Sequence, residues 1–174
     1  MDKLEFNKDH IIVGNEKFDK YLEESTIQQR IVELAEQINE DYKGKLPIFI
    51  GVLNGSFLFM ADLIKNINLS CEIDFFKLSS YGDSKISSGK VKLVKELNAD
   101  ILDRNVIIIE DIVDTGLSLK YIEEMMASYK PASVKVATLL FKPNSLKYDV
   151  KIDYIGFEIP DKFVIGYGLD YSQK

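Results

Sequence analysis

The amino-acid sequence predicts an α/β fold in which a central, mostly parallel sheet is flanked by helices. Apolar, β-branched runs alternate with segments of helical periodicity, which is typical of β–α–β units. The runs stay apolar throughout, as expected for strands that are buried on both faces. At 174 residues, without an internal repeat or a linker-like tract, the chain is interpreted as one domain over residues 1–174 with a sizeable core.

The first predicted element is an amphipathic helix over residues 25–42. Ser25 or Thr26 can cap its N-terminus, and Gly44 is placed to end it, because glycine readily adopts the left-handed conformation that often follows a helix. Its apolar residues recur at helical spacing and should form the buried face: Ile27, Ile31, Leu34, Ala35 and Ile38.

A buried strand over residues 47–53 should follow, because this run is short and rich in Ile, Val and Leu. It leads through the turn Asn-Gly-Ser at 54–56 into a second helix over 57–67. This helix is so strongly apolar that most of it must be covered by the rest of the protein. A further strand is predicted over 71–78.

After that strand the apolar patterning of the sequence is interrupted. Residues 79–90 are rich in serine and glycine and show no sustained apolar pattern, so we interpret them as a long mobile loop or an extended hairpin arm. Residues 91–94 would be a strand returning from that arm, and 105–109 a core strand.

The C-terminal part continues the alternation. A helix is predicted over 117–129, a buried strand over 134–141, and shorter strands over 154–157 and 164–166. The helix should bury the apolar residues that recur on one side: Leu119, Ile122, Met126 and Tyr129. In such folds ligands bind outside the C-terminal ends of the strands, which is where residues 110–118 fall.

Composition excludes several classes of function. The net charge of −6 argues against a non-specific nucleic-acid binder, because such binding depends on Lys and Arg side chains that neutralise phosphates. Cys71 has no second cysteine for an internal disulfide, which fits a reducing compartment, and His10 is the only histidine, so a zinc site is not expected. No targeting segment or membrane-spanning run is visible, and the expected location is the cytoplasm.

The most informative stretch runs from Val106 to Ser118. It joins a predicted strand to two adjacent carboxylates, Glu110 and Asp111, whose side chains should point to opposite faces if the strand ends there. Carboxylates accept hydrogen bonds from a vicinal diol such as that of ribose, directly or through hydrated Mg²⁺. The alternative is a solvated strand end, which is common in acidic proteins.

The residues after this pair favour a functional interpretation. Asp114 opens a turn of small and hydroxyl-bearing residues at a predicted helix N-terminus, where backbone N–H groups and the helix dipole suit a phosphate. A carboxylate beside a phosphate is repelled, so Asp114 should point toward the other end of the ligand, where it can exchange a proton with a heterocycle. The alternative is ordinary helix capping by Asp114 or Thr115, which leaves the acid pair and Gly116 unexplained.

The string Val106–Ser118 resembles the phosphoribosyl-pyrophosphate binding motif of the type I phosphoribosyltransferases, most closely that of the hypoxanthine (hypoxanthine-guanine) phosphoribosyltransferases. The resemblance covers nearly the whole chain. Residues 53–57 are similar to the family's pyrophosphate loop, 78–82 to the start of its mobile catalytic loop, Lys142 to its purine-contacting lysine, and 161–171 to its C-terminal purine-binding segment. The resemblance implies the type I phosphoribosyltransferase fold, with a small hood and a mobile loop.

For the sugar phosphate, the resemblance implies that Glu110 and Asp111 hold the ribose hydroxyls, and that Asn54, after a cis peptide bond, and Gly55 meet the pyrophosphate. It implies Mg²⁺ as cofactor, held by Asp170 with Glu110 and Asp111. The implied binding site for the 5′-phosphate is the turn made by Thr115, Gly116, Leu117 and Ser118.

For the base, the resemblance implies that Asp114 is the general base or acid at purine N7. Lys142 would donate to the 6-oxo group, which favours hypoxanthine or guanine over adenine. Phe163 would stack on the base, while the backbone of Val164 contacts its edge. The implied lid over the reacting centre contains Ser80 and Tyr81.

Two departures from the family concern the pyrophosphate. Many relatives have a lysine at the position of Asn54. The arginine that the family usually carries after Asp170 has no counterpart before the sequence ends at Lys174. Either Lys174 replaces that arginine, or another cation does, or the natural chain is longer.

The expected function is therefore purine salvage: Mg²⁺-dependent transfer of the phosphoribosyl group from phosphoribosyl pyrophosphate to hypoxanthine and guanine, giving IMP or GMP and pyrophosphate. Two alternatives stay open, a xanthine-preferring enzyme of the same fold and a non-catalytic regulator that senses phosphoribosyl pyrophosphate. The expected partners are the two small-molecule substrates and further copies of the chain in a dimer or tetramer, with neither nucleic acid nor a membrane.

Overall fold

The main sheet of the computed structural model, which describes residues 4–6, 10–13, 15–80, 91–95 and 97–169, has six strands in the order β6-β5-β4-β7-β8-β9. β5 pairs with β6 in antiparallel fashion, and all the other neighbours are parallel. The strands are β4 (Ile48–Leu53), β5 (Glu72–Ser80), β6 (Val91–Lys95), β7 (Asn105–Val113), β8 (Ser133–Phe141) and β9 (Tyr154–Glu158). The predicted mostly parallel α/β sheet is confirmed.

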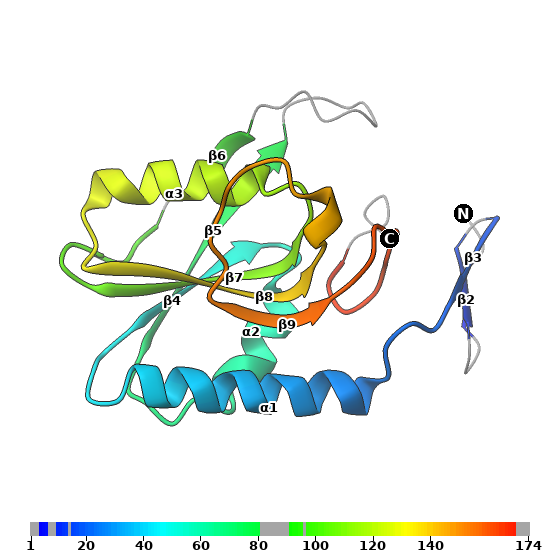
Figure 1. The fold of residues 1–174 in the computed structure, drawn as a ribbon, viewed down its shortest axis with the longest axis horizontal. Helices are drawn as coiled ribbons and strands as arrows, with labels where there is room; N and C mark the ends of the chain where they lie inside the picture. Colours follow the sequence, from blue (N-terminus) through cyan, green and yellow to red (C-terminus); the bar gives the residue numbers. More distant parts are fainter. Residues whose placement is uncertain (1–3, 7–9, 14, 81–90, 96, 170–174) are drawn as a thin grey trace.

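Helices cover both faces of this sheet, as Figure 1 shows. They are α1 (Glu24–Asp41) and α2 (Phe57–Ile64) on one face, α3 (Leu117–Tyr129) on the other, and a short 3₁₀ helix, η1 (Pro143–Ser145). Along β7, Ile107 and Ile109 pack with α1 and α2, whereas Val106 and Ile108 pack with α3. Successive side chains of a strand point to opposite faces of the sheet. A strand that packs into a core on each face therefore needs apolar residues in succession, which is the continuous apolar run seen in the sequence.

Helix α1 begins one residue earlier than predicted, and the predicted cap is wrong. Its N-cap is Glu23, without a side-chain cap bond, so Ser25 and Thr26 lie inside the first turn. The predicted end is confirmed, since Gly44 adopts a φ of +73° just after the helix. The predicted face is confirmed as well: Ile31, Leu34, Ala35 and Ile38 are fully buried, and Ile27 packs against them partly buried.

Helix α2 is less covered than its composition predicts. It ends at Ile64 rather than at residue 67, and two of its apolar side chains are exposed, Phe57 by 55% and Leu58 by 40%. Helix α3 has the predicted bounds, but Tyr129 is 39% exposed, so the buried face of α3 ends at Met126.

The sequence predicts that strand β7 ends before the acid pair. The observed strand instead continues through it. It stays paired with β8 up to Val113, although its pairing with β4 stops at Ile109. Glu110 and Asp111 therefore lie within a strand that has lost one neighbour. The strand predicted over 164–166 is also wrong, because the structure has there only an isolated bridge from Gly166 to Leu169.

The predicted hairpin arm is confirmed where the structure describes it. β5 and β6 run antiparallel, with Ser80 opposite Val91 at the end of the ladder. The arm contains part of the segment interpreted as a mobile loop, and residues 81–90 of that segment lie outside the described residues.

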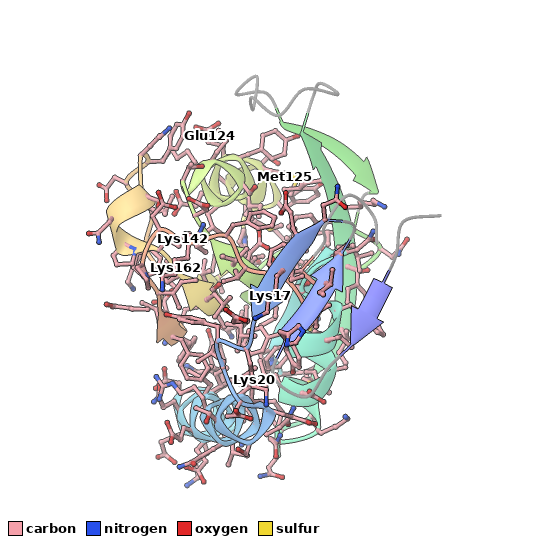
Figure 2. The ribbon with its side chains drawn as sticks, turned by 90° about the vertical axis from the view of Figure 1, so that its right-hand side faces the viewer. Lys17, Lys20, Glu124, Met125, Lys142 and Lys162 are labelled. Carbon is pink, nitrogen blue, oxygen red and sulfur yellow. The ribbon has the colours of Figure 1, made fainter. Side chains whose placement is uncertain are left out.

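A second, small sheet was missed as a set of elements, although the resemblance implied a hood. It contains β1 (Leu4–Phe6), β2 (His10–Val13) and β3 (Glu16–Asp19) in antiparallel order. The apolar run over residues 11–13 followed by Gly-Asn was a usable hairpin signal. In Figure 1 this sheet lies at the same end of the molecule as the red segment that leads to residue 169, and it is nearest the viewer in Figure 2.

The connectivity creates one favourable place for a ligand. From β4 the sheet grows toward β5 in one direction and toward β7 in the other, so the strand order reverses between β4 and β7. Loops leaving two such strands diverge, and a crevice forms at their C-terminal ends. No helix of the described residues is long and apolar enough to cross a membrane.

The opposite, N-terminal edge of the sheet is closed by a polar cluster. The Tyr154 hydroxyl at the start of β9 donates to Asp41 Oδ2 at the end of α1 over 2.5 Å, and Lys135 Nζ donates to the same oxygen over 2.7 Å. The hydrogen bonds from Lys135 and Tyr154 lower the pKa of the Asp41 carboxyl. This cluster ties α1 to β8 and β9 far along the strands from the crevice.

Candidate active site

A cavity of about 380 Å³ lies at the reversal point between β4 and β7. It is lined by Gly55 from the loop after β4, by Glu110 and Asp111 from β7, and by Thr115, Leu117 and Ser118 around the start of α3. A smaller hollow of about 100 Å³ is lined by Glu110 and residues 112–119. The larger cavity has the size of a small-molecule site, and both hollows share the turn.

The acid pair departs from the expectation that its side chains point to opposite faces. The Glu110 and Asp111 carboxyl groups lie close enough to influence each other's charge, and both residues line the same cavity. Burial, and then the charge of Asp111, raises the pKa of the Glu110 carboxyl well above its usual range. Burial also raises the pKa of Asp111. Among the described residues, neither the buried Glu110 nor the partly buried Asp111 forms an ion pair with a Lys or Arg, and ligand hydroxyls or a divalent cation would compensate their charge.

The donor set fits a magnesium ion that arrives with a phosphorylated ligand. The described residues contain no group of three or more His, Cys, Asp or Glu side chains able to hold a metal alone. Mg²⁺ commonly uses one or two carboxylates together with water and substrate phosphates, and Glu110 and Asp111 supply two. Asp170, the third predicted ligand, lies outside the described residues.

Replacing Glu110 with glutamine should stabilise the ligand-free protein at neutral pH. Because the folded-state pKa of Glu110 is raised, the wild type loses stability as pH rises from about 4.5 through that pKa, whereas glutamine does not titrate. Each pKa unit corresponds to about 1.4 kcal/mol, or roughly 3–5 °C in Tm at this size. Thermal unfolding between pH 5 and pH 8 should show a Tm advantage of Glu110→Gln that grows with pH; an advantage that shrinks with pH would contradict the assigned burial cost.

The turn before α3 has no side-chain cap at its N-cap residue. The N-cap of α3 is Gly116, with a φ of +83° and no side-chain cap bond. Thr115 Oγ1 only accepts a long bond of 3.4 Å from Leu117 N, and Asp114 is turned elsewhere. The capping alternative is therefore wrong. The first N–H groups of a helix have no intrahelical partner, and here they adjoin the smaller hollow, which suits an anion.

The Asp114 carboxylate pairs with Lys142. Its Oδ2 lies 2.8 Å from Nζ of Lys142, the residue that follows β8. Lys142 is only 6% exposed, so it is not the solvated strand-end lysine that its position alone would favour. Asp161 Oδ1 lies 3.5 Å from the same Nζ. The site thus presents a buried donor and a half-exposed acceptor side by side.

The C-terminal segment contributes an exposed aromatic ring, that of Phe163. Asp161 reaches Lys142, and Figure 2 shows Lys142 and Lys162 on the same side of the molecule. Phe163 is 64% exposed, and its ring centroid lies 6.1 Å from that of Phe18 in β3. The side chain is therefore no part of the core and is accessible to a flat ligand. Val164 is partly buried and packs against the core.

The Asn54–Gly55 loop is held between two other parts of the site. The Leu53–Asn54 peptide bond is cis, as the resemblance implied. A Cβ atom on Gly55 would overlap the Asp111 carboxylate, and a Cβ atom on Gly168 would overlap the carbonyl oxygen of Gly55. Both positions therefore require glycine. The backbones of the loop and of the C-terminal segment approach each other closely, with Asp111 on the far side of Gly55.

Two residues that lie behind the contact between Gly55 and Gly168, namely Asp62 and Tyr167, were not predicted from the sequence. The Tyr167 hydroxyl donates to Asp62 Oδ2 on α2 over 2.5 Å. A lone carboxylate within the apolar helix at 57–67 was a usable signal for Asp62, because such a group needs partners. Of the predicted lid, Ser80 is the last residue of β5, and Tyr81 lies outside the described residues.

Comparisons with known proteins agree with this geometry. The family described as "Phosphoribosyl transferase domain" matches residues 18–172. The hypoxanthine-guanine phosphoribosyltransferase of Bacillus subtilis is 47% identical over 153 residues, which is 88% of this chain and 85% of that protein. The hypoxanthine phosphoribosyltransferase of Escherichia coli K12 is 44% identical over 153 residues, 87% of this chain and 86% of that protein. A crystal structure of a hypoxanthine-guanine phosphoribosyltransferase from Bacillus anthracis has a TM-score of 0.85 and 43% identity, covering 90% of this chain and 92% of that one.

Proposed function

The chain belongs to the phosphoribosyltransferase family, and we propose that it is a purine-salvage enzyme that transfers the phosphoribosyl group of phosphoribosyl pyrophosphate to hypoxanthine or guanine. The products are IMP or GMP and pyrophosphate. The observation that carries this proposal is the Lys142–Asp114 pair, 2.8 Å apart, beside a cavity with ribose-type and phosphate-type binding groups.

The pair matches one edge of a 6-oxopurine. O6 and N7 are neighbouring positions on the ring system, and here a lysine Nζ and a carboxylate oxygen lie next to each other. Lys142 would donate to O6 while Asp114 accepts the N7 proton. Adenine carries an amino group at position 6, which leaves the buried lysine without an acceptor, so adenine should be a poor substrate.

The remaining groups would hold the sugar phosphate. Glu110 and Asp111 accept hydrogen bonds from the ribose 2- and 3-hydroxyls, and the turn over 115–118 binds the 5′-phosphate. The main chain of Asn54 and Gly55 faces the pyrophosphate. This arrangement leaves C1′ of the ribose between the purine pocket and the pyrophosphate loop.

The reaction then requires one bond exchange at C1′. The bond from C1′ to the pyrophosphate oxygen breaks with its electron pair on pyrophosphate, and purine N9 forms the new bond to C1′. The N7 proton passes to Asp114, which raises the electron density of the attacking ring; such proton transfers contribute about 10²- to 10⁴-fold. Phe163 stacks on the base and Val164 contacts its edge.

Magnesium is the proposed cofactor. Glu110 and Asp111, with Asp170, would hold it near the pyrophosphate. When bound, Mg²⁺ neutralises charge on the leaving pyrophosphate. The protein's own part is to keep the two carboxylates in one cavity, where their mutual repulsion favours a cation.

A direct assay tests the function. Purified protein with Mg²⁺, phosphoribosyl pyrophosphate and radiolabelled hypoxanthine should form labelled IMP and release pyrophosphate. No labelled nucleotide from folded protein would refute the proposal and would favour a regulator of the same fold. Competition by unlabelled guanine, xanthine and adenine should rank guanine first and adenine last; a first rank for xanthine would identify the xanthine-preferring alternative.

The chain is proposed to act in the cytoplasm as a homo-oligomer, a dimer or a tetramer, rather than on nucleic acid or at a membrane. The exposed apolar side chains of Phe57 and Leu58 on α2 support self-association, because a covered face would remove them from water. Light scattering coupled to size-exclusion chromatography measures the mass, and a monomer at micromolar concentration would contradict this part.

A further inference from the structure

Tyr167 has a backbone conformation that is unusual for its residue type. Its φ is +52°, and the neighbouring glycines, Gly166 and Gly168, both have a φ of +91°. Gly166 and Leu169 exchange two backbone hydrogen bonds, so Tyr167 and Gly168 are the central residues of a two-residue turn. Turns with positive φ at both central positions normally use Gly, Asn or Asp, and a bulky side chain there is unfavourable. The tyrosine side chain must therefore supply something that the turn itself does not need.

The side chain of Tyr167 is anchored to α2. Its hydroxyl donates to Asp62 Oδ2 over 2.5 Å, and the same oxygen accepts from Gln28 Nε2 of α1 over 2.7 Å. Asp62 Oδ1 accepts from Lys65 Nζ over 2.7 Å. Burial by itself would raise the pKa of the Asp62 carboxyl, but the bonds from Lys65, Tyr167 and Gln28 outweigh it and lower that pKa to about 2. At neutral pH, Asp62 is thus a charged acceptor that joins three segments of the chain.

The other side of the turn touches the pyrophosphate loop. Gly168 lies so close to the carbonyl oxygen of Gly55 that a Cβ atom would overlap it, and a Cβ atom on Gly55 would overlap the Asp111 carboxylate even more severely. Helix α2, which carries Asp62, begins two residues after Gly55. The loop is therefore held twice by the same turn, directly through Gly168 and indirectly through the Tyr167–Asp62 bond and α2.

We propose that Asp62 and Tyr167 are positioning residues that press the 166–169 turn onto Gly55 and thereby set the affinity of the enzyme for the pyrophosphate end of phosphoribosyl pyrophosphate. This inference rests on the proposed function. Neither side chain lines the cavity, so both act through the main chain of Gly55 and Gly168. The purine pair, Lys142 and Asp114, has no contact with this anchor and should keep its geometry.

Tyr167→Phe tests the anchor by removing one hydroxyl. The expected result is a KM for phosphoribosyl pyrophosphate that rises about tenfold, as for loss of a hydrogen bond to a charged group, with kcat and the KM for hypoxanthine changed by less than about twofold. Calorimetric titration with Mg²⁺ and phosphoribosyl pyrophosphate should show the same weakening of Kd. Asp62→Asn keeps the volume and one acceptor oxygen but loses the charge, and should give a smaller rise in the same KM.

Tyr154→Phe is the matched control. Its hydroxyl donates to an aspartate, Asp41, over the same 2.5 Å, but at the N-terminal edge of the sheet. It should lower Tm about as much as Tyr167→Phe while leaving the KM for phosphoribosyl pyrophosphate unchanged. An unchanged KM in Tyr167→Phe, or an equal rise in Tyr154→Phe, would overturn the inference. Absence of nucleotide formation by the wild type would instead refute the proposed function.

Discussion

Replacement of Asp114 by asparagine should lower kcat by about 10²- to 10⁴-fold, the range by which general acid–base groups contribute. Asparagine has nearly the same volume and keeps one oxygen, but it cannot take the N7 proton from the purine. Because the Asp114 carboxylate pairs with Lys142, affinity for phosphoribosyl pyrophosphate should stay within about threefold of the wild type. Steady-state kinetics and calorimetric titration separate the two quantities.

Asp161→Asn is the appropriate comparison, since Asp161 is the second carboxylate near Lys142 Nζ, at 3.5 Å, and is 73% exposed in its side chain. It should reduce kcat by less than about fivefold, as expected for an exposed ion pair. Equal losses in the two variants would assign the effect of Asp114→Asn to the environment of Lys142 rather than to proton transfer. An equal loss of turnover and of phosphoribosyl-pyrophosphate affinity in Asp114→Asn would contradict its placement on the purine side.

Gly55→Ala should reduce kcat/KM for phosphoribosyl pyrophosphate by about 10²-fold, because misplacement of a binding group by about 1 Å has effects of this size. The added methyl group would overlap the Asp111 carboxylate, so either the loop or the Asp111 side chain must move. On its other side the loop cannot retreat freely, since Gly168 lies against the Gly55 carbonyl. Kinetics with both substrates varied should place the loss on phosphoribosyl pyrophosphate.

Gly44→Ala controls for a general effect of losing a glycine. Gly44 has a φ of +73°, but a Cβ atom there would meet nothing within 4 Å, and the residue follows α1 outside the candidate site. It should cost about 1 kcal/mol of stability, because alanine disfavours positive φ, and leave kcat/KM unchanged. Full activity of Gly55→Ala would mean that Asp111 moves without consequence, which would contradict its assignment to the ribose.

The elements that the sequence predicted best are those whose signal is local. The apolar run of β7 and the periodic face of α1 each report burial residue by residue, and both are confirmed. The errors occur where a neighbouring element determines how far a strand extends or how much of a helix is buried. β7 continues past Ile109 because β8 still pairs with it, and Phe57 and Leu58 on α2 are exposed because no described element covers them.

Predictions for the candidate site likewise succeeded where the signal is local and failed where distant elements meet. The sequence predicted the acid pair, the turn at 115–118 and Lys142 at one sheet edge, since residues that follow parallel strands meet there. It did not predict that Glu110 and Asp111 line one cavity, in a part of β7 that no longer pairs with β4. It also assigned no role to Asp62 or Tyr167, whose bond joins positions 105 residues apart.

By itself, then, the sequence determined which chemical groups are present and in what order along the chain: carboxylates, a turn of small and hydroxyl-bearing residues, a lysine and an aromatic segment. Only the tertiary structure decided their mutual distances and their surroundings. It put Glu110 and Asp111 into one cavity, buried Lys142 against Asp114, and pressed Gly168 onto Gly55. The physical reason is that pKa values, ion pairs and close backbone contacts depend on separation and burial in space, which residues far apart in the chain set together.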